Sequence, residues 1–304
     1  MKEAWKGWAK KNRARKMERY VVSIEDVLKA ARRLQKKEEK LYVMANAEAV
    51  AEKINNLELG QQRKIQVFKK GKLREIYMAS VESKILQYIL IEKIKFRRYK
   101  YSFASRRGYS YVQAMKLLAK EIQNRYTLFT DIKDFFPSVT QTILLKEIPP
   151  KFRHFIKAIL RSFDGNGIPL GNPISGILAE IYLRDFDKKL QFIARHYNFT
   201  YIRYMDDIAV ICNSYEKSIF MLRKIRSYLL KISLGINESK TRIEYSQAFD
   251  YLGYRILRSV QIRRINRDSF LSMCLRKGIE YSRGFYQYSK HSQDNVNLLI
   301  EKMI

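Results

Sequence analysis

The spacing of apolar residues along the chain switches between the period of a helix and the period of a strand. Apolar positions three or four residues apart predict helices at 23–55, 81–98, 109–124, 152–163, 174–195 and 214–234. Short β-branched and aromatic runs predict strands at 126–130, 199–202 and 208–212, and hairpins at 65–77 and 241–257. The basic, tyrosine-rich tail from 259 to 304 is predicted to be helical. This order favours an α+β fold on a small antiparallel sheet.

Two adjacent acids, Asp206 and Asp207, interrupt the strand pattern. They lie between the apolar runs Phe199–Ile202 and Ile208–Cys212, and the gap between these runs has the length of a tight hairpin. Unpaired charges are costly to bury, so the pair is poorly suited to a core. Adjacent carboxylates at the tip of a hairpin are well suited to hold a divalent metal ion.

The chain carries a formal net charge of +30 on 304 residues. Residues 1–120 carry 31 Lys and Arg against 12 Asp and Glu, whereas residues 121–254 carry 19 against 14. The segment with the paired acids is therefore the least basic and is flanked by strongly basic ones. Lys and Arg neutralise phosphates and release their counterions, so nucleic acid is the expected partner. A soluble basic protein or one that binds acidic membranes is the alternative.

Other features of the composition limit the class of protein. Hydrophobic residues make up 46% of the chain, which excludes wholesale disorder. Two cysteines, Cys212 and Cys274, have no metal-ligand spacing, and three scattered histidines do not predict a zinc site. The chain has no apolar run of membrane-spanning length and its start is not a secretory signal, so we expect a cytoplasmic protein without a membrane partner.

A third acid, Asp131, ends the apolar strand at 126–130. Two metal ions about 4 Å apart commonly clamp the attacking and leaving oxygens in phosphoryl transfer, and one acidic pair is too few for this task. A carboxylate from a neighbouring strand is therefore expected beside Asp206 and Asp207. Taken alone, Asp131 would be an ordinary residue at the end of a strand.

The segment Asp131–Ser138 and the run Tyr204-Met205-Asp206-Asp207 together resemble two palm motifs of prokaryotic reverse transcriptases. The likeness extends over about residues 60–258 and includes the enzymes of diversity-generating retroelements and antiphage defence systems. It implies a right-hand polymerase of fingers, palm and short thumb that makes DNA on an RNA template. It also implies that Asp131, Asp206 and Asp207 are catalytic. Two Mg²⁺ ions, or Mn²⁺ in their place, are then expected at Asp131, Ile132 and Asp206.

The resemblance also assigns residues to the incoming dNTP. Phe136 stands where the family places a bulky residue beneath the sugar, and a ring there would exclude a ribose 2′-OH. Gly171 matches a glycine that lets the backbone approach the nascent base pair, and Leu170 replaces the usual Gln before it, which implies looser discrimination. The further assigned residues are Lys72, Arg74, Asp134 and Lys240. Outside these motifs, Phe136 would be an ordinary core aromatic. Lys72 and Arg74 would belong to an exposed charged turn, and Lys240 would be an ordinary surface lysine.

Contacts to primer and template are implied for a larger set that lies at the palm hairpin, in a template-supporting loop, at a primer-gripping hairpin and in the thumb. These residues are Tyr204, Met205, Arg106, Arg107, Tyr251, Leu252, Gly253, Arg263 and Arg264. The domains expected from the resemblance are a basic helical extension at 1–59, fingers at 60–125, a palm at 126–254 with a finger insertion at about 141–170, and a thumb at 255–304.

The expected partners are dNTPs, a DNA primer or product, and an RNA template that is a structured noncoding RNA, together with an accessory protein or a second copy of the chain. The favoured setting is antiphage defence; error-prone copying in a diversity-generating retroelement is the alternative. Synthesis without a template or from a protein hydroxyl also fits. Two rivals remain: an RNA-dependent RNA polymerase, and a catalytically silent RNA-binding scaffold.

Overall fold

The structure is a computed structural model that describes residues 19–69, 72–105, 109–121, 125–245, 248–251, 254–257 and 261–263. From residue 248 onward the description is of the backbone. The chain divides into two compact units. Unit 1 draws on Met1–Arg97 and Asp134–Arg184, and unit 2 on Arg98–Lys133 and Asp185–Ile304.

Unit 1 begins with helices that pack on one another, as the helical spacing predicts. They are α2 (Ile24–Ala31), α3 (Lys37–Ala45), α4 (Ala47–Asn55) and α5 (Val81–Lys93). Ser23 starts α2 with a capping box: its Oγ accepts from the backbone N–H of Asp26 at 3.2 Å, and the Asp26 carboxylate accepts from the N–H of Ser23 at 3.4 Å. The helix predicted over 81–98 ends earlier, at Lys93.

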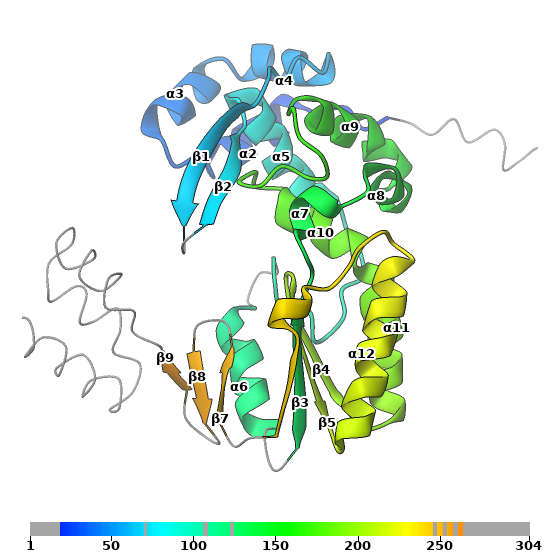
Figure 1. The fold of residues 1–304 in the computed structure, drawn as a ribbon. Coiled ribbons are helices and arrows are strands. Elements are labelled where there is room, and N and C mark those ends of the chain that lie inside the picture. The colour runs from blue at the N-terminus through cyan, green and yellow to red at the C-terminus, as the bar shows by residue number, and fades with distance from the viewer. Residues whose placement is uncertain are drawn as a thin grey trace, which may run out of the picture. The chain divides into compact units, whose positions relative to one another are not determined.

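The predicted hairpin at 65–77 is present in unit 1 as β1 (Arg63–Lys69) and β2 (Lys72–Met78), paired antiparallel (Figure 1). Short helices follow: α7 (Phe135–Ser138), α8 (Gln141–Glu147), the 3₁₀ turn η1 (Pro150–Phe152), α9 (Arg153–Arg161) and α10 (Ser175–Tyr182). The loop before α10 runs beside β2, because the N–H of Tyr77 donates to the carbonyl of Leu170 at 2.8 Å. The Asn172 amide donates back to the carbonyl of Tyr77 at 3.0 Å.

Unit 2 is built on a four-stranded antiparallel sheet in the order β4-β5-β3-β6. Its elements are α6 (Tyr111–Glu121), β3 (Tyr126–Asp131), α11 (Arg184–His196), β4 (Thr200–Tyr204), β5 (Asp207–Cys212), α12 (Tyr215–Leu230), the 3₁₀ turn η2 (Glu238–Lys240) and β6 (Arg242–Tyr245). The prediction of a small antiparallel sheet that carries the three acids is therefore confirmed. Among the described residues, no helix combines the length and the apolar character needed to cross a membrane.

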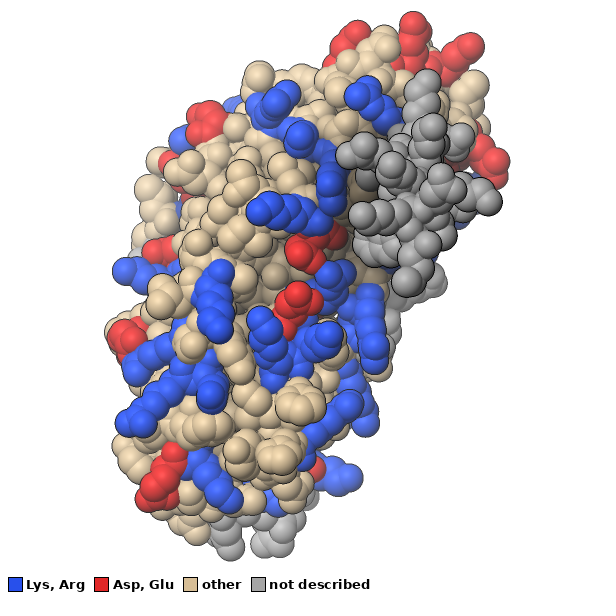
Figure 2. Space-filling model, turned by 90° about the vertical axis from the view of Figure 1, so that its right-hand side faces the viewer, with Lys and Arg blue, Asp and Glu red and all other residues tan. Residues whose placement is uncertain are grey.

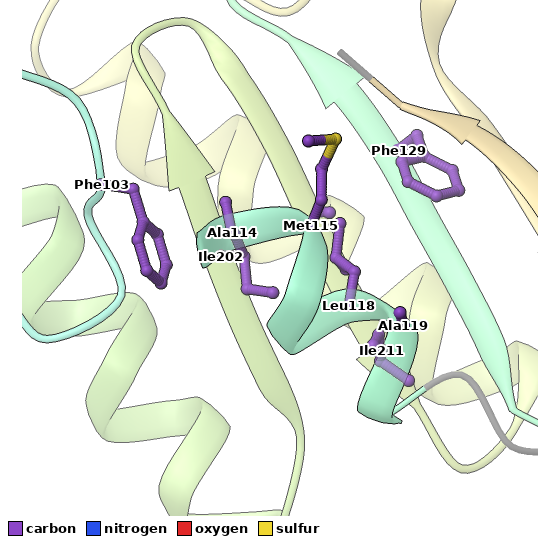
Figure 3. Close-up of a cluster of buried hydrophobic side chains, with 9 residues drawn as sticks. Phe103, Ala114, Met115, Leu118, Ala119, Phe129, Ile202 and Ile211 are labelled. Atoms are coloured by element: carbon purple, nitrogen blue, oxygen red, sulfur yellow. The ribbon is translucent and has the colours of Figure 1, made fainter. Parts of the chain in front are cut away.

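Alternate residues of the strands point to opposite faces of this sheet, and each face is covered by helices (Figure 1). One face packs on α6 through Phe129, Ile202, Ala209 and Ile211, with Met115 and Leu118 from the helix (Figure 3). The other face lies against α11 and α12, which bury Leu190, Met221 and Ile225 among others. The apolar strands are thus buried on both sides.

Three predictions of secondary structure are wrong. The helix at 174–195 is two helices, because α10 stops at Tyr182 and α11 starts at Arg184. The hairpin at 241–257 is divided between two sheets: β6 pairs with β3, while β7 (Ala248–Tyr251) and β8 (Tyr254–Leu257) pair with each other. Residues 261–263 form a strand, β9 (Gln261–Arg263), beside β8 rather than a helix. The rest of the predicted helical tail lies outside the described residues.

Candidate active site

The register of β3 and β5 brings the acids together. Asp131 pairs directly with Asp207, and the N–H of Ile132 donates to the carbonyl of Asp206 at 3.1 Å. Residues directly opposite in an antiparallel pair have Cβ atoms about 5 Å apart and point to the same face. Asp131 and Asp207 therefore share the face that packs on α6, at the end of the sheet where the β4–β5 turn carries Asp206.

The turn between β4 and β5 is held from the opposite face of the sheet by Arg203. Its side chain is fully buried, and its Nη1 donates to the carbonyl of Met205 at 2.8 Å. Nε and Nη2 of Arg203 donate to the two carboxylate oxygens of Asp187 on α11, at 2.8 and 2.6 Å. Met205 has a φ of +56°, in the left-handed region that side chains rarely adopt. The contact from Arg203 stabilises this conformation directly beside the paired acids.

Lys240 reaches the acids because the segment that precedes it follows the end of β3. The N–H of Lys133 donates to the carbonyl of Gly235 at 2.9 Å, and the N–H of Asn237 donates to the carbonyl of Asp131 at 2.8 Å. The Lys240 ammonium donates to Oδ2 of Asp131. This hydrogen bond is the largest cause of a raised pKa at Lys240; burial opposes it, and the charges of Asp131, Asp207 and Asp206 add to it. All three carboxylates thus act on one ammonium.

The chemistry of these side chains fits a divalent cation. Asp131 is 5% exposed, and its second oxygen, Oδ1, is buried without a hydrogen-bond partner. Like charges directly opposite in a sheet repel, so Asp131 and Asp207 call for a positive charge between them. In this structure Lys240 supplies part of it. The described residues contain no group of three or more His, Cys, Asp or Glu already arranged to hold a metal ion.

Comparison with known proteins decides the family. A family model described as reverse transcriptase (RNA-dependent DNA polymerase) matches residues 62–256. The chain belongs to this family. The resemblance drawn from the palm motifs is therefore confirmed.

Curated relatives include retron reverse transcriptases of Escherichia coli. The chain is 32% identical to the Ec73 enzyme over 165 residues, which are 48% of this chain and 51% of the relative. It is 29% identical to the Ec86 enzyme over 188 residues, which are 58% of this chain and 57% of the relative. The chain thus spans little more than half the length of these relatives.

Solved structures with a similar fold include telomerases from two Candida species. The telomerase of Candida albicans, solved with a fragment of telomeric RNA, has a TM-score of 0.54 at 12% identity and covers 79% of this chain and 54% of its own. The apo telomerase of Candida tropicalis has a TM-score of 0.53 at 11% identity, with coverages of 80% and 57%. At these identities the likeness shows the fold, which confirms the predicted fold class.

In unit 1, three of the residues assigned to the nucleotide, Phe136, Leu170 and Gly171, lie around one loop. The carbonyl of Phe136 accepts from the N–H of Ile168 at 3.0 Å, and Leu170 lies beside Tyr77 of β2 as described above. Gly171 has a φ of +99°, and a Cβ there would come within 2.3 Å of Ile76. Phe135 is buried and Phe136 half-buried, so the first of the two rings is the core aromatic. Their roles toward a nucleotide stay predictions.

The other residues predicted to contact the nucleotide, primer or template differ in how far they are buried. Arg74 and Asp134 are exposed, and Asp134 precedes α7 with a φ of +42°. Tyr204 and Met205 are half-buried; burial raises the pKa of Tyr204, whose ring meets that of Tyr111 edge-on. The structure describes the backbone alone of Lys72, Tyr251 and Arg263. Arg106, Arg107, Leu252, Gly253 and Arg264 lie outside the described residues.

Sequence reasoning missed the buried pair of Arg203 and Asp187. Tyr201 joins it, because its hydroxyl donates to Oδ1 of Asp187 at 2.6 Å. A signal was present: Arg203 is a charged residue inside an apolar strand, and a charge in such a place needs a partner. The identity of the partner, sixteen residues earlier on a helix, could not be deduced without the pairing of the elements.

Proposed function

We propose that the protein is an RNA-directed DNA polymerase that adds dNTPs to a primer 3′-OH. The observation that carries the proposal is the register that places Asp131 opposite Asp207, with Asp206 on the adjoining turn, in a chain of this family. Asp131 and Asp206 would hold two Mg²⁺ ions, with Asp207 beside them. Metal ions at this site would stabilise the charge that develops on the attacking and leaving oxygens.

The proposal also assigns a role to Lys240, first as a counter-ion of Asp131 and then as a general acid. A lysine side chain is protonated at neutral pH, and the bond to Asp131 raises the pKa of Lys240 further, so Lys240 neutralises Asp131 while no other cation is bound. A cation held by the Asp131 carboxylate would displace the Lys240 ammonium from it, and Lys240 could then turn to the triphosphate. There it can donate a proton to the departing pyrophosphate, which is general acid catalysis.

Primer extension on an RNA template tests the activity. We expect the wild type to extend a DNA primer with dNTPs in the presence of Mg²⁺, and Asp206→Asn to abolish extension. Asp164→Asn, which removes an exposed carboxylate from unit 1, is the matched control and should leave extension unchanged. Preference for rNTPs would indicate an RNA polymerase instead. Full biological activity of Asp206→Asn would indicate a silent scaffold.

The retron relatives support a finer proposal, in which the template is a dedicated, structured noncoding RNA and the setting is antiphage defence. Sequencing of the nucleic acids that copurify with the protein tests this. One abundant RNA species, together with a complementary DNA product that disappears in Asp206→Asn, is the expected result. A broad mixture of cellular RNAs without a discrete DNA product would contradict it.

A further inference from the structure

A groove runs between α11 and α12 in unit 2 and encloses about 580 Å³. Each helix has a stripe of residues three or four positions apart that line the groove, separate from the stripe that packs on the sheet. These helices cover the face of the sheet opposite to the one shared by Asp131 and Asp207. The groove is therefore distinct from the catalytic acids.

The lining of the groove combines aromatic rings with lysines. Phe192 is 74% exposed. The ammonium groups of Lys189 and Lys224 lie 5.5 and 5.3 Å from the ring centroids of Tyr228 and Phe220, respectively. Three lysines and one acid, Asp185, are among the described lining residues. Figure 2 faces these helices and shows that Lys and Arg predominate there over Asp and Glu.

We propose that this groove binds a single-stranded segment of RNA, at a site separate from the primer and template at the palm. Bases stack on exposed rings whatever their sequence, and Lys side chains neutralise the phosphates between them. Phe192 offers an exposed ring on which a base can stack. A lysine held over a ring by cation–π attraction can turn to a phosphate when a base takes the ring face.

A protein partner fits the groove less well. Lysine is depleted from the centres of protein–protein interfaces, because its strongly hydrated ammonium must lose water there. The lining is mainly apolar, as in grooves that take an amphipathic helix, but Lys188, Lys189 and Lys224 also line it, and their ammonium groups suit phosphates better than the apolar face of a helix. The mixture of rings and lysines is the one used for single strands.

Fluorescence anisotropy with a labelled oligouridine of about 15 nucleotides, a length that one such site can engage, tests the proposal on the full chain. We expect Phe192→Ala to weaken binding at least about fivefold, the lower end of the loss per stacked base, and Phe192→Tyr to restore it. Lys188→Ala with Lys189→Ala should reduce the slope of log affinity against log salt by up to about 1.4, or about 0.7 per lost phosphate contact. Arg195→Ala with Arg223→Ala, which removes two exposed charges from the same helices, is the matched control for the pair of lysines.

Several outcomes would overturn the proposal. Equal losses in the lysine and arginine pairs would indicate a diffuse charge effect rather than a site. If a 4-thiouridine oligonucleotide formed photocrosslinks only to residues outside α11 and α12, the strand would lie elsewhere on the protein. Self-association that Phe192→Ala abolishes, with RNA binding intact, would assign the groove to a second copy of the chain. Binding of an acidic amphipathic peptide in preference to RNA would assign it to a protein.

The groove test is independent of the polymerase test. On a short primer–template duplex the groove variants should keep wild-type extension, because none of these residues lies at the catalytic acids. Loss of oligouridine binding together with intact extension supports the groove as a separate site. Asp206→Asn is the reciprocal control. Loss of primer extension with intact oligouridine binding in this variant would show that binding in the groove does not depend on the acids.

Discussion

Arg203 and Asp187 form a fully buried ion pair, and the same guanidinium holds the carbonyl of Met205 in the turn beside Asp206 and Asp207. Side-chain exposure is 0% for Arg203 and 3% for Asp187. The pair thus connects α11 to the one turn whose conformation determines where Asp206 points. A link of this kind makes the geometry of the site depend on the packing of a helix on the opposite face of the sheet.

Removal of one partner of this pair should be strongly destabilising. We expect Arg203→Met or Asp187→Leu alone to lower the free energy of unfolding by about 3–5 kcal/mol, because each leaves an uncompensated buried charge. The double variant should recover much of the stability, since both charges are gone. Its rate of primer extension should nevertheless stay below that of the wild type, because the carbonyl of Met205 has lost its hydrogen-bond donor. Urea unfolding and primer extension of the folded fractions measure both effects. Recovery of wild-type rate in the double variant would show that the turn does not need Arg203.

If Asp131 holds a metal ion, as proposed above, Lys240 and that ion would compete for the same carboxylate. Lys240→Met should therefore lower the Mg²⁺ concentration needed for half-maximal activity, while kcat falls by about 100-fold through loss of the general acid. Titration of Mg²⁺ in a primer-extension assay separates the two changes. Lys116→Met removes an exposed lysine from α6 and should change neither. If the Mg²⁺ concentration for half-maximal activity fell while kcat stayed unchanged, Lys240 would be a counter-ion of Asp131 and not a general acid.

The raised pKa of Lys240 predicts a pH dependence of stability. A lysine whose pKa is higher in the folded state stabilises fully below its unfolded value of about 10.4, and this contribution is lost as pH rises through the folded value. The difference in unfolding free energy between wild type and Lys240→Met should be constant from about pH 7 to 9 and shrink above about pH 10.4. Chemical denaturation across this range checks it. A difference that grows with pH would contradict the direction of the shift.

Much of the candidate site could be predicted from local pattern. Apolar runs around Tyr204–Asp207 and before Asp131 indicate strands that end at acids, and the structure pairs those strands as expected. The partners of strands further along the chain were harder to deduce. The strand Arg242–Tyr245 pairs with β3 rather than with the strand that follows it, and nothing in four residues of sequence indicates that choice.

The break between α10 and α11 is a second feature that could not be predicted from the sequence. Leu183 is neither Gly nor Pro, and it is fully buried, so the apolar pattern continues across the break. Helix ends without Gly or Pro are set by tertiary packing rather than by propensity. Asp185 and Asp187 in the first turn of α11 are a weak signal of a new N-terminus. The buried role of Asp187 became visible once α11 was placed against Arg203.

Gly167 supports the segment that carries Phe136. Its φ is +72°, and a Cβ would come within 2.1 Å of the carbonyl oxygen of Phe136. We expect Gly167→Ala to lower the free energy of unfolding by at least about 1 kcal/mol, the cost of a side chain in the left-handed region, and to slow dNTP addition. Gly235→Ala is the control, since a Cβ there meets nothing within 4 Å. Thermal unfolding and primer extension of both variants decide whether the close approach matters.

Phe136 is expected to select the sugar of the incoming nucleotide. Its ring is half-buried next to the core ring of Phe135, with ring centroids 5.7 Å apart, so it is held in place by packing. Phe136→Ala should reduce the preference for dNTPs over rNTPs at least about tenfold, because the steric exclusion of the 2′-OH is lost while other contacts stay. The ratio of kcat/KM for dGTP and GTP on one template measures this. Phe192→Ala removes a ring from the groove between α11 and α12 and should leave the ratio unchanged. An unchanged ratio in Phe136→Ala would mean that sugar selection depends on another residue.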